Sequence, residues 1–154
     1  MPRERKWGPF SITEALEEAF ENGKAEIETL YEEMDEWRNN MEQSEGLSQT
    51  QKFEEVEECA DTLERAKDAL DSVELAELNL ATETVVFTDI KKRGYPRHVR
   101  CTNAVNRLEA VKAHLQNAVE NEEDETAVEK LEEQIEYLEE ATGELEGIMF
   151  PGMF

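Results

Sequence analysis

The sequence predicts an all-α fold of two antiparallel helical hairpins, a four-helix bundle or a coiled-coil-like pair, with a short extended basic connector. Three observations predict it. Apolar residues recur at spacings of three and four along four segments, glutamates dominate the positions between them, and short polar loops separate the members of each pair. A chain of 154 residues is long enough to form one domain with its own core.

We divide this single domain into five parts. They are a basic N-terminal arm (1–10), a first helical hairpin (11–74), a basic extended connector (75–103), a second helical hairpin (104–147) and an apolar C-terminal tail (148–154). The hairpins carry net charges of −16 and −11, whereas the arm and the connector each carry +2, within a formal net charge of −23. Two acidic blocks are therefore joined and preceded by basic segments.

The first hairpin begins with the clearest helical pattern. Ser11 and Glu14 have the spacing of a capping box, which predicts a helix start at residue 11. Glycine costs about 1 kcal/mol relative to alanine inside a helix, so Gly23 on the apolar seam indicates a bulky partner side chain or a close backbone. The heptad seam of this helix comprises Leu16, Phe20, Gly23, Ile27, Leu30, Met34, Trp37 and Met41.

A loop over residues 43–50 leads to a second helix, for which Ser48 and Gln51 predict a capping box. Its 3–4 pattern runs from Phe53 to about residue 74. Because the loop is short, the two helices should fold back as an antiparallel hairpin.

The connector interrupts the helical pattern. Thr84–Ile90 is rich in β-branched and aromatic residues and predicts a strand, and residues 91–96 predict a turn. We expect Arg97–Cys101 to return as an extended segment, which gives a small hairpin or a clamp across the helices.

The second hairpin follows the same plan as the first. Thr102 or Asn103 is expected to cap a third helix, Asn121–Glu125 to form an acidic loop, and Thr126 with Glu129 to cap a fourth helix. The seams are Ala104, Leu108, Val111, Leu115 and Ala118, then Val128, Leu131, Ile135, Leu138, Thr142 and Leu145. The tail cannot be helical beyond Pro151.

Glutamates at i, i+4 spacing form the main candidate site. Like charges at this spacing destabilise a helix by a few tenths of a kcal/mol, so their repetition favours a surface that faces a basic partner. A nucleic-acid-binding protein is such a partner, because its groove is built for phosphates. A solvated acidic face without a specific partner, or another basic partner, explains the pattern as well. The proposed residues are Glu17, Glu21, Glu28, Glu32, Glu54, Glu58, Glu132, Glu136 and Glu140.

Sequence motifs of catalysis are missing from the chain. It has no nucleophile-elbow motif, no phosphate-binding glycine loop, no EF-hand spacing and no Cys-x-x-Cys pair, so we expect no enzyme, no cofactor and no metal site. Cys59 and Cys101 are expected to be free core thiols of a reducing compartment, although Arg100 and a nearby helix start could lower the pKa of Cys101. Without a long apolar run or a signal peptide, the chain is expected to be cytoplasmic, without membrane or direct nucleic-acid binding.

Two further segments permit two interpretations each. The connector cations, with Tyr95 among them, could stack on nucleic acid or could clasp the protein's own acidic helices, and the charge balance favours the clasp. The tail could be an apolar hook for a partner or a plug for the open end of the bundle.

Five stretches carry a resemblance that spans most of the chain: Trp7–Pro9, Met34–Glu42, Arg93–Pro96, Arg100–Ala104 and Phe150–Met153. In these stretches the chain resembles a group of small acidic helical proteins of tailed bacteriophages. The resemblance implies a viral origin. It supplies no site residues, because none of these motifs has an assigned chemical role.

We therefore predict a non-enzymatic acidic interaction protein, a phage-type inhibitor or decoy that imitates DNA toward a basic host protein. The alternative is a structural or assembly component of a viral particle, found in the virion and bound to neighbouring subunits. A heptad seam this long could also pair between chains, which permits a homo-oligomer. In the alternative, the arm and tail residues that anchor the chain are Trp7, Phe150, Met153 and Phe154.

Overall fold

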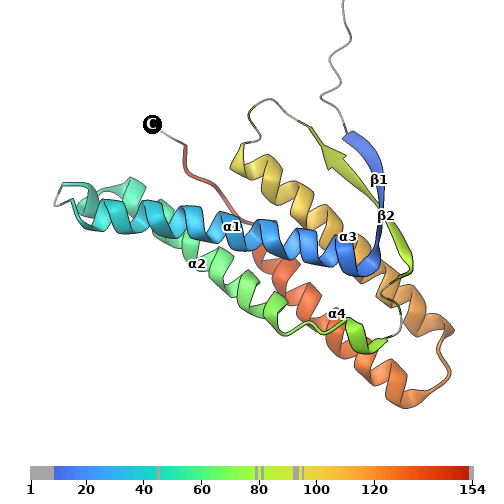
Figure 1. The fold of residues 1–154 in the computed structure, drawn as a ribbon. Coiled ribbons are helices and arrows are strands. Elements are labelled where there is room, and N and C mark those ends of the chain that lie inside the picture. The colour runs from blue at the N-terminus through green and yellow to red at the C-terminus, as the bar shows by residue number, and fades with distance from the viewer. Residues whose placement is uncertain are drawn as a thin grey trace, which may run out of the picture.

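The computed structural model describes residues 9–44, 46–78, 80, 82–91, 94 and 96–152. Within these ranges the fold is four helices and one two-stranded antiparallel sheet (Figure 1). The elements are β1 (Pro9–Ala15), α1 (Leu16–Glu42), α2 (Gln51–Asp71), β2 (Thr84–Ile90), α3 (Arg97–Asn121) and α4 (Glu125–Glu146), with short 3-10 turns at Leu47–Gln49 and Ala76–Leu78. The prediction of a mostly helical chain is confirmed, but the small sheet means that the fold is not wholly α.

The helices form a bundle around one core. α1 packs on α2 and α3, and α4 packs on the same two helices, so the order around the ring is α1, α2, α4, α3. The sheet packs on α3 through β2. In Figure 1 the loop end of the α1–α2 hairpin projects beyond the start of α3.

The predicted seams are the core of the bundle. All members of the first seam are buried except Trp37, which is half-buried and packs against the core. Burial of each large side chain stabilises the fold by roughly 1.5–3 kcal/mol, an upper estimate because unfolded chains already bury some surface. The large side chains with almost no exposure are Leu16, Ile27, Leu30, Met34, Leu63, Leu70, Leu108, Leu115 and Leu138.

The predicted start of the first helix at Ser11 is wrong, because Pro9–Ala15 is the strand β1. Phe10, Ile12 and Glu14 turn inward in alternation with exposed Ser11 and Thr13, which is the period of a strand. The capping box is replaced by a backbone contact: the Leu16 N–H at the start of α1 donates to Glu83 O at 2.7 Å. The predicted arm of residues 1–10 therefore ends at residue 8, and residues 1–8 lie outside the described part.

The strand predicted at Thr84–Ile90 is confirmed, but its predicted partner is wrong. β2 pairs with β1 in antiparallel register, from Pro9 opposite Ile90 to Ala15 opposite Thr84. Arg97–Cys101 is helical instead of extended, because α3 begins directly after Pro96, whose fixed φ suits a helix start. The predicted cap at Thr102 or Asn103 therefore lies inside α3.

Two other helix starts differ from the expected capping boxes by two residues each. Thr50, not Ser48, caps α2 by accepting from the Phe53 N–H at 3.2 Å. Asp124, not Thr126, caps α4 by accepting from the Thr126 N–H at 3.3 Å. In both cases another side-chain acceptor stands close to the predicted one, and sequence spacing alone does not distinguish them.

Gly23 marks the close approach of α1 to α3, as its place on the seam predicts. A Cβ built at Gly23 would lie 3.2 Å from the Leu108 side chain and 3.3 Å from Ala104 O. Gly143 on α4 is a helical glycine without such close packing, because a Cβ there would meet nothing within 4 Å.

We predict that alanine has different effects at these two glycines. Gly143→Ala should raise the free energy of unfolding by about 0.5–1 kcal/mol, because helix propensity improves without a clash. Gly23→Ala should lack this gain, since overpacking costs roughly 1–3 kcal/mol and offsets it. Urea denaturation measures both values, and equal gains in the two variants would contradict the close packing of α1 on α3.

Candidate interaction surface

The nine glutamates predicted to form the acidic face all lie on α1, α2 and α4. Glu28 is half-buried and the other eight are exposed. None of the nine carboxylates forms an ion pair or a hydrogen bond with any residue of the described ranges. They are Glu17, Glu21, Glu28 and Glu32 on α1, Glu54 and Glu58 on α2, and Glu132, Glu136 and Glu140 on α4.

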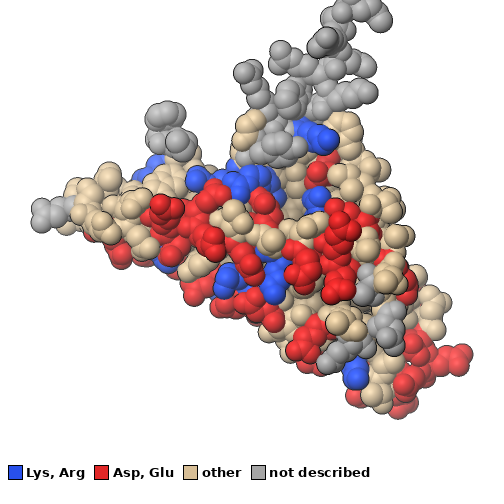
Figure 2. Space-filling model, viewed as in Figure 1, with Lys and Arg blue, Asp and Glu red and all other residues tan. Residues whose placement is uncertain are grey.

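The three helices that carry these glutamates are neighbours in the bundle. α2 lies between α1 and α4, and the net charges of α1, α2 and α4 are −8, −5 and −8. α3 on the other side of the ring carries +2. In the face drawn in Figure 2, acidic side chains spread over much of the surface. The bundle therefore has an acidic exterior on three of its four helices.

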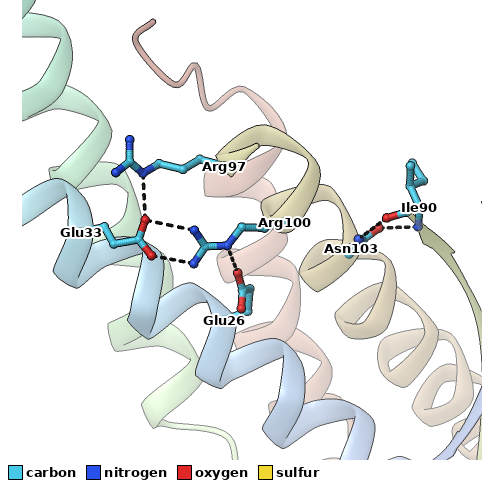
Figure 3. Close-up of polar contacts among 6 residues, drawn as sticks. All are labelled: Glu26, Glu33, Ile90, Arg97, Arg100 and Asn103. Atoms are coloured by element: carbon cyan, nitrogen blue, oxygen red, sulfur yellow. Dashed lines mark hydrogen bonds and ion pairs between the residues drawn. The ribbon is translucent and has the colours of Figure 1, made fainter. Parts of the chain in front are cut away.

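A second group of carboxylates is used inside the fold. Arg100 on α3 holds Glu33 with two hydrogen bonds, Nη1–Oε1 at 3.0 Å and Nη2–Oε2 at 2.6 Å, and its Nε reaches Glu26 Oε1 at 2.5 Å (Figure 3). The Arg97 Nε donates to the same Glu33 at 3.0 Å. We call these four residues the arginine clasp, because they join the start of α3 to the middle of α1. The bidentate geometry makes it a strong contact.

Arg107 forms a comparable contact under the sheet. Its Nη1 lies 2.9 Å from Asp89 Oδ1 of β2, its Nε lies 3.4 Å from Glu14 Oε1 of β1, and its guanidinium lies 4.5 Å from the centre of the Phe87 ring. All three charged side chains are at most 16% exposed. One arginine of α3 therefore holds both strands.

The clasp interpretation of the basic connector is confirmed at Arg97 and Arg100. Lys91 lies 5.3 Å from the centre of the Phe10 ring, which also keeps this cation on its own chain. Lys92, Arg93 and Tyr95 lie outside the described residues. Two arginines that could have contacted phosphates are therefore neutralised by the protein's own glutamates.

The sequence interpretation did not identify Glu26 and Glu33 as special. They stand seven residues apart on α1, each directly before a buried seam residue, Ile27 and Met34. Charged residues that flank a heptad seam face the partner helix, and this position is the signal that could have identified them.

An open cleft of about 500 Å³ lies beside the clasp and is lined by residues of α1, α3 and β2. Its charged lining is balanced, because Arg100 and Arg107 face Glu26 and Asp89. The cleft therefore presents no excess charge to an ion. Among the described residues, no group of three or more His, Cys, Asp and Glu side chains could hold a metal.

The tail crosses the bundle instead of extending from it, at least as far as Gly152. Phe150 is half-buried and packs against the core with Ile148, and the Lys52 Nζ donates to Gly152 O at 2.8 Å. Met149 is 83% exposed. Of the predicted anchors, Phe150 is therefore engaged with its own chain, while Trp7, Met153 and Phe154 lie outside the described residues.

Both cysteines are free and buried. Burial raises the pKa of the Cys59 thiol and of the Cys101 thiol to about 12, so neither thiol is activated. The lowered pKa considered for Cys101 does not occur, because burial outweighs the nearby helix start. Cys59 and residues of the tail both line a cleft of about 390 Å³.

None of the helices in the described part of the chain combines the length and the apolar run that a bilayer crossing requires. No protein-family model, curated protein or solved structure matches the chain.

We predict that Glu33 stabilises the fold in a pH-dependent way. Hydrogen bonds from Arg100 are the main reason that the pKa of Glu33 is lowered. A lowered folded-state pKa contributes stability above the ordinary carboxyl pKa of about 4.3, and this contribution is lost as the pH falls through the folded value.

The test is Glu33→Gln, which should lower the free energy of unfolding by about 1 kcal/mol at pH 7, because the pair is only partly shielded from water. The difference from the parent chain should vanish in acid. Glu32→Gln, at the exposed neighbouring position, is the control and should cost far less. A difference that persists unchanged in acid would contradict the ion-pair origin.

We also predict that the tail protects Cys59. In a Cys101→Ala background, deletion of residues 148–154 should speed modification of Cys59 by a disulfide reagent at least about tenfold, since local opening becomes easier. The same deletion in a Cys59→Ala background should change the rate at Cys101 much less. Equal acceleration at both thiols would indicate general loosening of the bundle instead.

Proposed function

We propose that this chain is a non-enzymatic acidic interaction protein, a phage-type inhibitor that occupies the basic nucleic-acid groove of a host protein. One observation carries the proposal: within the described part of the chain, nine glutamates on three neighbouring helices form no ion pair or hydrogen bond, whereas Glu26 and Glu33 nearby are paired. The described contacts therefore give these nine carboxylates no role inside the fold.

The arrangement of charge supports a basic partner. Electrostatic attraction between a field of one sign and a complementary groove raises the association rate and falls steeply with ionic strength. Carboxylates that repeat once per helical turn match a phosphate row in sign, although not in density or regular spacing. The clasp leaves the net charge unchanged, because it pairs Arg97 and Arg100 with Glu26 and Glu33, but it engages two of the cations of the chain with its own carboxylates.

A role as a particle component is less well supported. That alternative relies on the arm and the tail as anchors, and in the tail Phe150 would first have to leave its own core. Full burial of such a side chain contributes roughly 1.5–3 kcal/mol, so release of the half-buried Phe150 costs a part of this, which a partner subunit would have to offset.

The test compares two variants with equal changes in net charge. The first replaces Glu54, Glu58, Glu132 and Glu136 by Gln, and the control replaces Glu109, Glu120, Glu122 and Glu123, which lie on α3 and just beyond it. Host proteins captured at low salt by the parent chain should be lost by the first variant and kept by the control. Duplex DNA should compete with the parent chain for them.

Capture of the basic partner should weaken as the ionic strength rises. Capture should weaken by at least about tenfold between 50 and 200 mM salt, because several charge pairs break together. The proposal fails if nothing basic is captured at low salt. It also fails if both variants lose capture equally, since net charge alone would then account for binding.

A further inference from the structure

The sheet has one covered edge and one open edge. Asn103 on α3 binds the outer edge of β2, where its Oδ1 accepts from the Ile90 N–H at 2.7 Å and its Nδ2 donates to Ile90 O at 2.8 Å (Figure 3). Asn106 donates to Thr88 O at 2.9 Å on the same edge. β1 has no strand on its other side within the described part of the chain.

The pairing pattern identifies the backbone groups at the open edge. The Leu16 N–H bonds to Glu83 O in line with the sheet register, and Ile90 opposite Pro9 turns its N–H and C=O away from β1. Hydrogen-bonded and non-bonded pairs alternate in an antiparallel ladder. Ser11 and Thr13 therefore direct their N–H and C=O groups toward the open edge.

The outer face of the sheet carries no charged side chain, in a protein of which 36% of the residues are charged. Val86 is 63% exposed there. Outward-facing charges, above all lysines, commonly guard natural edge strands, and β1 has none on its outer face, because Glu14, its one charged residue, points inward to Arg107. The outer face consists of Pro9, Ser11, Thr13 and Ala15 of β1 and Thr84, Val86, Thr88 and Ile90 of β2.

We propose that β1 is a dimer interface through which two copies of this chain join their sheets. The two β1 strands pair antiparallel about a two-fold axis at Ile12, so that Ser11 of each copy lies opposite Thr13 of the other. Each such pair exchanges two backbone hydrogen bonds, and the four strands form one continuous sheet.

The distribution of charge around β1 favours a second copy of the chain as the occupant of the open edge. The open strand and the uncharged face allow close contact between two molecules of net charge −23 without opposed carboxylates. In this register Pro9 of one copy lies opposite Ala15 of the other, directly before the first turn of α1 with Glu17 and Glu18. The eight residues that precede Pro9 in the sequence carry a net charge of +2, which complements the charge of these acids.

The first test is the mass in solution of the full chain and of two variants at the same position. The parent chain should show twice its 17.8 kDa in light scattering or sedimentation at micromolar and higher concentrations. Thr13→Pro removes an N–H that the chain itself does not use, and should raise the dimer dissociation constant at least about tenfold, because one hydrogen bond per copy is lost. Thr13→Ala keeps that N–H and should remain a dimer.

Amide hydrogen exchange in the parent chain supplies a second test that does not depend on whether the proline variant folds. The Ser11 and Thr13 amides should exchange at least about tenfold more slowly at concentrations that favour the dimer than at dilution. A parent chain that is monomeric throughout overturns the proposal. A dimer in which these two amides exchange as unprotected groups, or a folded Thr13→Pro chain that dimerises as tightly as Thr13→Ala, overturns it as well.

Discussion

Like-charge repulsion is the constraint on which this fold depends, and α3 is the element that relieves it. α1 and α4, each with a net charge of −8, do not pack on one another; both pack on α3, which carries +2. Arg100 and Arg107 bring this charge to the acidic residues of α1 and of the sheet. α2, which carries −5, packs on both as well, so α3 is the one helix of the ring whose net charge is opposite to that of its neighbours.

The parts of the fold that the sequence predicts correctly are those that local periodicity determines. Seam residues such as Ile27 and Leu30 repeat at helical spacing, and burial of one implies burial of the next. β1 could not be predicted in this way, because its partner residues lie 69 to 81 positions away and the alternation covers only Pro9–Ala15. Ser11 and Glu14 show the limit of a short motif, since the same four residues fit a capping box and a strand.

In the candidate surface, too, periodicity predicts some features and leaves others undetermined. Exposure of glutamates such as Glu21 and Glu136 follows from the seams, because residues opposite a buried stripe face water. Prediction of the clasp would have required knowledge of which helix packs against α1. The seams alone would have fitted an α1–α4 contact equally well. The choice depends on Gly23, where the missing Cβ admits Leu108 and Ala104 of α3 and brings Arg100 within reach of Glu26 and Glu33.

The sheet packs on α3 and touches α1, whereas α2 and α4 lie away from it, and this separation links the two proposals. The sheet packs on α3, which lies diagonally across the ring from α2, so two chains joined through β1 keep their α2 and α4 surfaces open. A dimer then presents two acidic surfaces in fixed relation, and binding of the second to a repetitive or dimeric basic partner becomes intramolecular. Affinity would rise without any stronger single contact, which suits a surface whose charges match a phosphate row in sign but not in regular spacing.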